Sequence, residues 1–370
     1  MTAQSALEES PNSSPVTESF ERLLIVRLGS MGDMIHTLPA VIALRRAFPE
    51  ATLGWIVEER WAELLCTVSE PRCGPCSRQR PIVDKVHAVH MKQWRGSLVS
   101  AQTWERMAAA SSELRAPQYQ VAIDFQGAAR SAILARWSGA PRTCGFRQPR
   151  ENVATMLYTR QVEARGTHVV EQNLSLAEAV AHRALEMPRA EFPCDAAAEE
   201  RIQDWLRLRN ITDFILLNPG AGWGAKQWPA ERFGYVAKAL GKDGIGSLVN
   251  FGPGEEELAC NAESASGGAA ISISCSLAEL IGLTKRARLF IGGDTGPMHL
   301  AAALNIPVVA VFGPTDPARN GPFGTRCRVL RAASSPTSLS HRSTPDPGML
   351  EITVEQVVAA ARQSLGESGG

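Results

Sequence analysis

The segment GGDTGPMHLAAA at 292–303 carries an acid, a hydroxyl and a histidine at a glycine-rich turn. An apolar run precedes it and a helical pattern follows it. Small residues at a strand-to-helix turn leave backbone N–H groups free to face an anion. Gly296 lets a phosphate approach and Thr295 can donate to it, while Asp294 and His299 can hydrogen-bond a sugar or a phosphate. An ordinary helix N-cap is the alternative interpretation.

A second turn, RLGSMGDMIH at 27–36, follows the first apolar run of the chain. Its Gly-x-x-Gly-Asp spacing lacks the Gly-x-Gly-x-x-Gly pattern of dinucleotide-binding turns. An acid here would repel a pyrophosphate, but it can accept a proton from a hydroxyl. The helix N-terminus favours the ionised carboxylate. Asp33 is therefore a candidate general base, with simple capping of the helix as the alternative.

Two later turns supply one cation and one acid. The run LNPGAGWGAKQWP at 217–229 has three glycines and one lysine, Lys226, which together suit a diphosphate. No Gly-Lys-Ser/Thr follows, so this is not a Walker loop, and a solvent-exposed lysine beside a tryptophan is the alternative. In FGPGEEE at 251–257, Glu255 can take the hydroxyls of a ribose. Acidic enrichment of a first helical turn is the alternative for Glu255.

The N-terminal half has one more such turn, DFQGAARS at 124–131, and several cations near predicted strand ends. Some of these cations can hold an anionic substrate opposite a nucleotide, although most surface arginines hold nothing. They are Lys92, Arg95, Arg130, Arg147 and Arg150.

These turns depend on an alternation of strand-like and helical patterns along the chain. The predicted strands lie at 23–28, 53–57, 83–89, 121–125, 214–218, 247–251, 271–274, 289–291 and 308–312. The predicted helices lie at 34–48, 61–68, 98–114, 171–185, 199–208, 230–240, 255–264, 277–287, 298–304 and 351–365. Such alternation predicts an α/β protein with parallel sheets wrapped by helices.

A proline- and alanine-rich stretch at 187–198 divides this series into two halves of similar size. We therefore predict two facing, Rossmann-like, doubly wound domains. Because ligands bind beyond the carboxyl ends of parallel strands, two facing sheets make an interdomain cleft that holds one ligand on each side.

Composition narrows the function. The chain has 370 residues, with 38 Lys and Arg against 38 Asp and Glu, so no broad basic field attracts nucleic acid. No apolar run approaches the ~20 residues of a membrane span, and the first twenty residues lack a signal core and indicate a disordered tail. Eight cysteines in a long chain indicate free thiols. A metal or redox role for Cys73 and Cys76 stays open as the less favoured interpretation.

Taken in order, these turns resemble a known family. The matching segments are VRLGSMGDMIHTLPA at 26–40, WIVEE at 55–59, IDFQG at 123–127, KQWP at 226–229, GDTGPMH at 293–299 and FGPTDP at 312–317. They are similar to the lipopolysaccharide heptosyltransferases, family nine of the glycosyltransferases, from residue 22 to about residue 330. The first segment is most similar to heptosyltransferase I, whereas NPGA at 218–221 is closer to heptosyltransferase II.

The resemblance implies a GT-B fold with an ADP-heptose donor in the C-terminal domain and an acceptor in the N-terminal one. It implies that Asp33 is the catalytic base and that Lys226 binds the donor phosphates. The other donor residues that it implies are Ala221 and Gly222 in the lysine loop, Glu255 on the ribose, Cys275 beside the adenine, and Asp294, Thr295, Gly296 and His299. The acceptor residues that it implies are Lys92, Arg95 and Arg150, and Arg130 joins them through its charge and position.

With this resemblance we expect a tail at 1–20, an acceptor-binding domain at 21–190, a nucleotide-sugar-binding domain at 191–335, and a loop with a C-terminal helix at 336–370. The expected reaction is an inverting transfer of L-glycero-D-manno-heptose from ADP-heptose to the Kdo region of a lipid A-linked acceptor. We expect no metal or other cofactor, because no Asp-x-Asp pair lies by these turns. The expected location is cytoplasmic, with transient contact at the inner face of the inner membrane.

Three other functions are weighed against this one. Within the family, the chain is alternatively a heptosyltransferase II or another ADP-sugar transferase. A nicotinamide-dependent oxidoreductase would also use two Rossmann-like halves, although the missing Gly-x-Gly-x-x-Gly opposes it. A non-catalytic nucleotide-sugar binder would bind the donor without releasing ADP.

Overall fold

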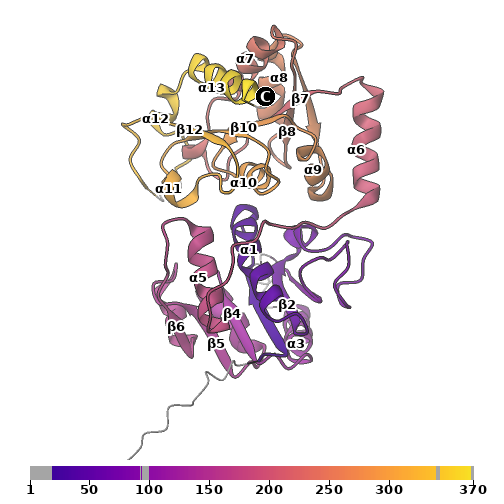
Figure 1. Ribbon diagram of the computed structural model, residues 1–370, viewed down its shortest axis with the longest axis vertical. Coiled ribbons are helices and arrows are strands. Elements are labelled where there is room, and N and C mark those ends of the chain that lie inside the picture. The colour runs from indigo at the N-terminus through magenta and orange to yellow at the C-terminus, as the bar shows by residue number, and fades with distance from the viewer. Residues whose placement is uncertain (1–18, 92, 94–99, 339–341, 368–370) are drawn as a thin grey trace, which may run out of the picture.

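The structure, a computed structural model, describes residues 19–91, 93, 100–338 and 342–367 (Figure 1). The expected tail lies almost wholly outside the described residues, and so do Lys92 and Arg95. Helices alternate with strands, and the strands form two six-stranded sheets, one in the lower and one in the upper half of Figure 1. The α/β prediction with two sheets is confirmed.

The first sheet has the order β3-β2-β1-β4-β5-β6, and its neighbouring strands run parallel. Its strands are β1 (Arg22–Val26), β2 (Thr52–Glu58), β3 (Lys85–Val89), β4 (Val121–Asp124), β5 (Arg142–Phe146) and β6 (Arg160–Val162). The helices of this half are α1 (Met31–Ala47), α3 (Ala101–Arg115), α4 (Ala129–Trp137) and α5 (Val169–Ala181), with the 3₁₀ turns η1 (Glu59–Leu64) and η2 (Asn152–Leu157). Helices on both faces explain why the central strands β1 and β4 are apolar and buried over most of their length.

The second sheet has the order β12-β11-β10-β7-β8-β9, again with parallel neighbours. Its strands are β7 (Phe214–Asn218), β8 (Gly246–Phe251), β9 (Ala270–Ser274), β10 (Leu289–Gly293), β11 (Val308–Phe312) and β12 (Cys327–Arg331). Its helices are α6 (Ala196–Leu208), α7 (Ala230–Gly241), α8 (Glu256–Ser266), α9 (Leu277–Thr284), α10 (Gly296–Ala303), α11 (Pro317–Asn320), α12 (Pro347–Glu351) and α13 (Val354–Gly366), with the short 3₁₀ turn η3 (Gly224–Lys226). The C-terminal helix α13 packs into the core of this half.

Both sheets have the doubly wound strand order, so each has one point where the chain reverses its direction of winding. In the first sheet this point lies between β1 and β4, and in the second it lies between β7 and β10. The crevice beyond the carboxyl ends of these two strand pairs is where such sheets bind ligands. Four of the five turns singled out in the sequence follow these four strands, and the fifth, at 251–257, follows β8.

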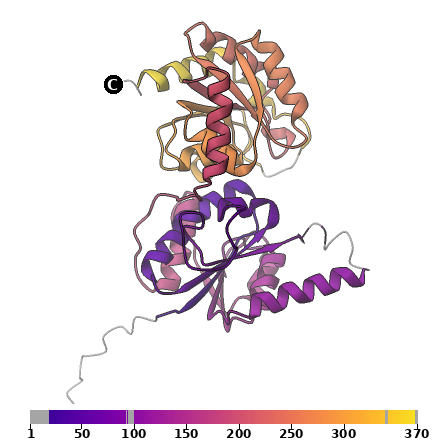
Figure 2. The same cartoon turned by 90° about the vertical axis from the view of Figure 1, so that its right-hand side faces the viewer.

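The two halves meet through helices α1 and α10, whose N-terminal turns face each other at the centre of Figure 1. The apolar core continues across this junction, from Met31 and Met34 of α1 to Met298 and Leu300 of α10. The chain passes from the first half to the second through an extended segment that leads into α6, as Figure 2 shows from the side.

Several predicted boundaries were wrong. The helix expected at 61–68 is a 3₁₀ turn that ends at Leu64, because the backbone N–H of Thr67 bonds to the carbonyl of Gln79 in the loop before β3. The helix expected at 171–185 ends at Ala181, where His182 takes a left-handed backbone conformation. The helix expected at 351–365 begins at Val354, because Thr353 caps it.

Other elements were missed. The stretch 187–198, expected as a linker, already enters α6 at residue 196. Short or weakly periodic elements gave little signal and were not predicted. These are α4, β5, β6, β12, η2, α11 and α12.

Candidate active site

Asp33 lies in the first turn of α1, three residues after the N-cap Ser30. One carboxylate oxygen, Oδ2, accepts the backbone N–H and the hydroxyl of Ser30, both at 3.0 Å. The other, Oδ1, is 2.6 Å from the Arg27 guanidinium. The capping alternative is therefore partly right, since one oxygen caps the helix. The second oxygen belongs to an ion pair that capping does not need.

The electrostatics keep Asp33 ionised. Burial alone would raise its pKa, but the Arg27 charge and the two Ser30 donors outweigh burial and hold the pKa below its usual value. The side chain is still 35% exposed, so a substrate can reach it. An ionised and accessible carboxylate at a ligand-binding edge can accept a proton from a hydroxyl.

Arg27 and Gln126 position this turn, and the sequence analysis assigned neither a role. Arg27 is buried, and it donates through Nη1 to the carbonyl of Phe125 while Nη2 meets Asp33. The side-chain oxygen of Gln126 accepts the backbone N–H of Leu28 at 2.8 Å. The turn after β4 therefore holds the turn after β1. A single cation at the end of an apolar strand, six residues before an acid, was the available signal.

Asp124 is the last residue of β4, paired in register with Val26 of β1, and it has a different character. It is fully buried, and it accepts bonds from the Tyr158 hydroxyl at 2.7 Å, the Ser131 hydroxyl at 2.8 Å and two backbone N–H groups. Burial raises its pKa against these donors. Asp124 braces its own turn and is closed to a substrate.

On the other side of the junction, Lys226, Asp294 and His299 form one cluster. The Lys226 ammonium is 2.5 Å from Asp294 Oδ2, and His299 Nε2 is 3.1 Å from Asp294 Oδ1. Lys226 also lies 4.1 Å from the ring centre of Trp223, a cation–π contact. Its side chain is only 11% exposed, so the alternative of a solvent-exposed lysine is wrong. The pKa of Asp294 is lowered, because its bonds to His299 and Lys226 outweigh burial.

Helix α10 starts beside this cluster without a side-chain cap. Thr295 is its N-cap residue, but the Thr295 side chain makes no capping bond and Pro297 has no N–H. The alternative interpretation of this turn, an ordinary side-chain N-cap, is therefore wrong. Asp294 points instead to Lys226 and His299, so the first N–H groups of α10 can face an anion.

The Asp33 turn and the cluster of Lys226, Asp294 and His299 approach each other at two glycines. A Cβ on Gly32 would lie 2.5 Å from Cδ2 of the His299 ring, and a Cβ on Gly296 would lie 2.6 Å from the Met31 sulfur. Glycine at these positions lets the N-terminal turns of α1 and α10 approach each other. The Asp33 turn and the Asp294 turn therefore border the same junction.

Comparison with known proteins agrees with this arrangement. The sequence profile of glycosyltransferase family 9 (heptosyltransferase) matches residues 107–347. The chain belongs to this family. Lipopolysaccharide heptosyltransferase 1 of Pseudomonas aeruginosa is 30% identical over 311 residues, which cover 82% of this chain and 81% of that protein. Lipopolysaccharide heptosyltransferase 1 of Escherichia coli K12 is 28% identical over 84% of this chain and 93% of that protein.

Solved structures give the same result. The E. coli heptosyltransferase WaaC with ADP superposes with a TM-score of 0.71 at 26% identity, covering 94% of this chain and 99% of that one. The same enzyme with ADP-2-deoxy-2-fluoro heptose has a TM-score of 0.68 at 27% identity. The GT-B fold and the assignment as a glycosyltransferase, a heptosyltransferase of lipopolysaccharide core biosynthesis, follow from these matches. They exclude the oxidoreductase and the non-catalytic binder.

The remaining donor-side candidates of this heptosyltransferase lie at the same edge of the second sheet. The Glu255 carboxylate accepts the backbone N–H of Gly252 at 2.9 Å and lies where a Cβ on Gly220 would be, so the turn after β8 meets the loop after β7. In that loop Ala221 is half-buried, and Gly222 is exposed with open space around it. Cys275 follows β9, and burial raises the pKa of its thiol to about 12.

The acceptor-side candidates do not form one cluster as the donor-side candidates do. Arg130 opens α4 and is exposed, as is Arg150, whose backbone lies 3.1 Å from where a Cβ on Gly127 would be. Arg147 pairs instead with Glu163 at 3.3 Å. Lys92 and Arg95 belong to the undescribed stretch.

Two other features stand apart from the junction. Cys73 and Cys76 are exposed free thiols in the loop before β3, and no group of metal-ligating side chains occurs within the described ranges.

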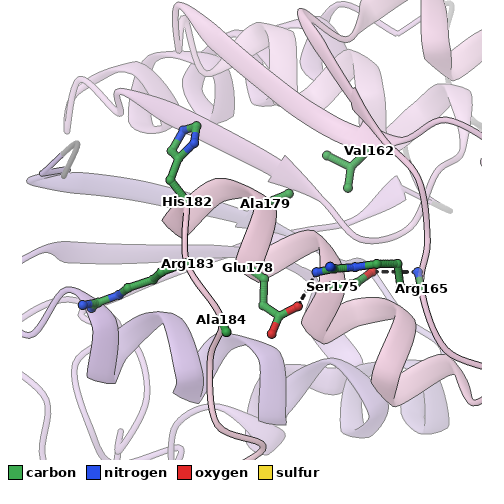
Figure 3. Close-up of a pocket in the computed structure, with 8 residues that line it drawn as sticks. All are labelled: Val162, Arg165, Ser175, Glu178, Ala179, His182, Arg183 and Ala184. Carbon is green, nitrogen blue, oxygen red and sulfur yellow. Dashed lines mark hydrogen bonds and ion pairs between the residues drawn. The ribbon is translucent and has the colours of Figure 1, made fainter. Parts of the chain in front are cut away.

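A hollow of about 400 Å³ lies beside α5 (Figure 3). Its Glu178 pairs with Arg165 at 2.5 Å, and its Arg183 donates to the Ala47 carbonyl, so the charges of this hollow are already satisfied.

Proposed function

We propose that this heptosyltransferase moves L-glycero-D-manno-heptose from ADP-heptose to the Kdo region of a lipid A-linked acceptor, with inversion at the anomeric carbon. One observation carries the proposal: an ionised, accessible Asp33 and the Lys226–Asp294–His299 cluster border the same domain junction. A base and a diphosphate-binding cluster on opposite sides of one junction are what a single displacement requires.

The donor is assigned to the second half, over 191–335. Two of the three N–H groups of the Lys226 ammonium point at Asp294 among the described residues, and the third can meet a phosphate oxygen. The uncapped start of α10 adds backbone donors and the positive end of a helix. Relatives solved with ADP and with a fluorinated ADP-heptose support this donor.

Four further residues complete the proposed donor site. Glu255 is suited to the ribose hydroxyls, since its carboxylate lies at the end of β8 beside the glycine loop. The protonated Cys275 thiol is suited to the apolar face of an adenine. Ala221 and Gly222 let the diphosphate approach the backbone.

The acceptor is assigned to the first half, over 21–190. Asp33 takes the proton of the acceptor hydroxyl, and the resulting oxygen attacks the anomeric carbon from the face opposite ADP. Negative charge then grows on the departing diphosphate, where Lys226, the Thr295 hydroxyl and the α10 N–H groups stabilise it. No step of this displacement needs a metal ion, because these groups supply the positive charge.

The acceptor is the Kdo region on lipid A, because exposed arginines suit an anionic saccharide. The two curated relatives named heptosyltransferase 1 favour the first heptose over the second. The described helices are all too short or too polar to span a membrane. Transfer to a lipid-anchored acceptor requires contact with the inner membrane surface.

The test is the release of ADP from ADP-heptose, with and without deacylated Kdo-lipid A. Wild-type protein is expected to release ADP only with the acceptor, and NMR of the product is expected to show the inverted anomer. The Asp33→Asn variant should lose about 10²–10⁴-fold in kcat, because general-base catalysis is worth that much. Its affinity for ADP, measured by calorimetry, should stay within a few-fold of the wild-type value.

The controls separate the alternatives. An acceptor that already carries the first heptose tests heptosyltransferase II, and preference for it would overturn the acceptor assignment. Near-normal turnover of Asp33→Asn would overturn the mechanism. Unchanged rates after treatment with a chelator are expected, and a loss of activity restored by a divalent cation would contradict metal independence.

A further inference from the structure

A row of exposed side chains follows α4 at every third position. Arg130, Ile133 and Arg136 are exposed, while the residues between them are buried in the sheet. Residues three apart lie next to each other on a helix, so this row covers one outer side of α4. Ile133 is 41% exposed.

A second row follows η2 with the same spacing. Arg150, Val153 and Met156 are exposed, as are Glu151 and Asn152, while Ala154 is buried. A 3₁₀ helix repeats every three residues, so Val153 and Met156 project on the same side. Their exposed fractions are 53% and 81%, which is unusual for apolar side chains of this size.

The two rows lie side by side. Ala132 of α4 packs against Ala154 and Tyr158 in one small cluster, and the backbone N–H of Ala129 donates to Glu151 at 2.9 Å. These contacts fix α4 against η2 along their inner sides. The outer residues therefore form one surface, here called the α4–η2 surface, made of Arg130, Ile133, Arg136, Arg150, Val153 and Met156.

The charge of this surface is positive although the whole chain is neutral. Its three arginines form no ion pair within the part of the chain that the structure describes. The neighbouring Glu163 is already paired with Arg147, and Glu151 is bonded to the start of α4. Apolar tips between unpaired cations are typical of proteins that rest on anionic lipid, where the tips enter the interface and the cations meet the headgroups.

We propose that the α4–η2 surface docks this enzyme on an anionic phospholipid bilayer. The inference rests on the proposed function, because a lipid-anchored acceptor stays at such a bilayer. The arginine ends of both rows begin at the Gly127 turn, at the carboxyl end of β4. That turn also holds the Arg27–Asp33 pair through the Phe125 carbonyl. Docking through these rows thus brings the headgroup layer to the edge of the sheet where Asp33 lies.

The test measures partition of the full-length protein onto vesicles of phosphatidylglycerol and phosphatidylethanolamine, with phosphatidylcholine vesicles as the neutral comparison. The double variant Val153→Ser/Met156→Ser should lower the partition coefficient about tenfold, because two apolar side chains no longer enter the interface. Arg136→Gln should lower it about fivefold on anionic vesicles only, and the effect should shrink as salt is added.

The matched control is Val68→Ser/Leu208→Ser, which removes two apolar side chains that are 81% and 76% exposed elsewhere. It should bind vesicles as the wild type does. Equal losses in both double variants, or wild-type protein that ignores anionic vesicles, would overturn the docking surface. Thermal melts should show that all variants are folded.

Activity separates this inference from the proposed function. With water-soluble, deacylated acceptor, Val153→Ser/Met156→Ser should keep the wild-type kcat and KM, whereas with vesicle-embedded acceptor its KM should rise about tenfold, in step with the lost partition. If wild-type protein transfers no heptose but the vesicle result holds, the proposed function fails and the docking surface stands.

Discussion

At the residue scale, two aspartates near the carboxyl ends of two neighbouring strands have opposite properties. Asp33 is partly exposed and paired with Arg27, so its pKa is lowered. Asp124 is fully buried among neutral donors, and burial raises its pKa. Both are acids in glycine-containing turns after buried strands. Only the position of Arg27, at the end of β1, makes the first of them a better candidate for proton transfer from a substrate.

The first prediction concerns Arg27. Replacing it with methionine removes the cation that lowers the pKa of Asp33, so the pKa of Asp33 should rise. Because the base must be ionised to work, the acid limb of the kcat–pH profile should move to higher pH. Steady-state ADP release, followed from about pH 5 to about pH 9, measures this shift of the acid limb.

The control for Arg27→Met is Arg147→Met. Arg147 forms an exposed pair with Glu163 in the same half of the molecule, and exposed pairs contribute little. Its profile should match that of the wild type. An acid limb that stays in place in Arg27→Met would show that the Arg27 charge does not govern Asp33.

At the scale of elements, helices α1 and α10 form the junction because glycine stands where they meet. Gly32 lies in the first turn of α1, where alanine would ordinarily favour the helix by up to about 1 kcal/mol. At this position a Cβ would collide with the His299 ring at 2.5 Å. The requirement for close approach between the two domains therefore outweighs the local preference of the helix.

The second prediction follows from this contact. Gly32→Ala should displace the His299 ring or separate α1 from α10, and a misplacement of about 1 Å near reacting groups can cost about 100-fold in rate. We expect kcat to fall by that order, with the melting temperature changed by only a few degrees. Kinetics and a thermal melt on the same preparation measure both quantities.

Gly282→Ala is the matched control, since Gly282 is a helical glycine of α9 with ordinary contact distance, 3.5 Å, to Glu199. It should leave kcat unchanged. If Gly32→Ala were as active as Gly282→Ala, the approach of α1 to α10 would have no role in catalysis.

At the scale of the whole molecule, three histidine rings join the two domains. His36 of α1 lies 4.1 Å from His299 of α10 and 5.3 Å from His168, measured between ring centres. His168 caps α5 by accepting the backbone N–H of Val170 and, through Nε2, donates to the Gly321 carbonyl of the other domain at 3.0 Å. This pattern of bonds requires a neutral His168 ring.

The rings of His36 and His168 are held neutral. The pKa of His36 is well below its usual value, because of burial and of the neighbouring His299, His168, Arg27 and Arg319. Burial also lowers the pKa of His168, against the opposing pull of the Gly321 carbonyl. Their unfolded forms therefore bind protons at a higher pH than the folded protein does.

The third prediction gives the sign of the resulting pH dependence. Because the folded-state pKa values are depressed, this contribution to stability is fully present above about pH 6.5, the unfolded value, and declines as the pH falls toward the folded values. The free energy of unfolding should drop by up to about 1.4 kcal/mol per pH unit for each of the two histidines. Urea denaturation on both sides of pH 6.5 measures the drop.

His168→Gln should remove the contribution of His168 to the pH dependence of the free energy of unfolding. It should also lower stability at neutral pH, because it removes a helix cap and a hydrogen bond between the domains. The exposed His90 offers the control, and His90→Gln should keep the wild-type slope. A slope that is the same in His168→Gln as in the wild type would contradict the assignment.

The sequence by itself determined the chemistry-bearing turns and the class of fold. Apolar runs and helical periods depend on near neighbours, so the strands at 214–218 and 308–312 were predicted with their observed bounds. The turns with Asp33, Lys226 and Asp294 stood out because glycine, acids and lysine at strand ends are local patterns. Weakly periodic elements such as α4 and β12 were missed, since their burial depends on distant segments.

Only the tertiary structure decided which of these groups work together. The pairing of Arg27 with Asp33 spans six residues, that of Lys226 with Asp294 spans 68, and the Gly32–His299 contact joins different domains. Such partners have no common sequence period, because they meet only when two sheets place the carboxyl ends of their strands at one junction. Charge and burial there, rather than residue type, separate the candidate base Asp33 from the bracing Asp124.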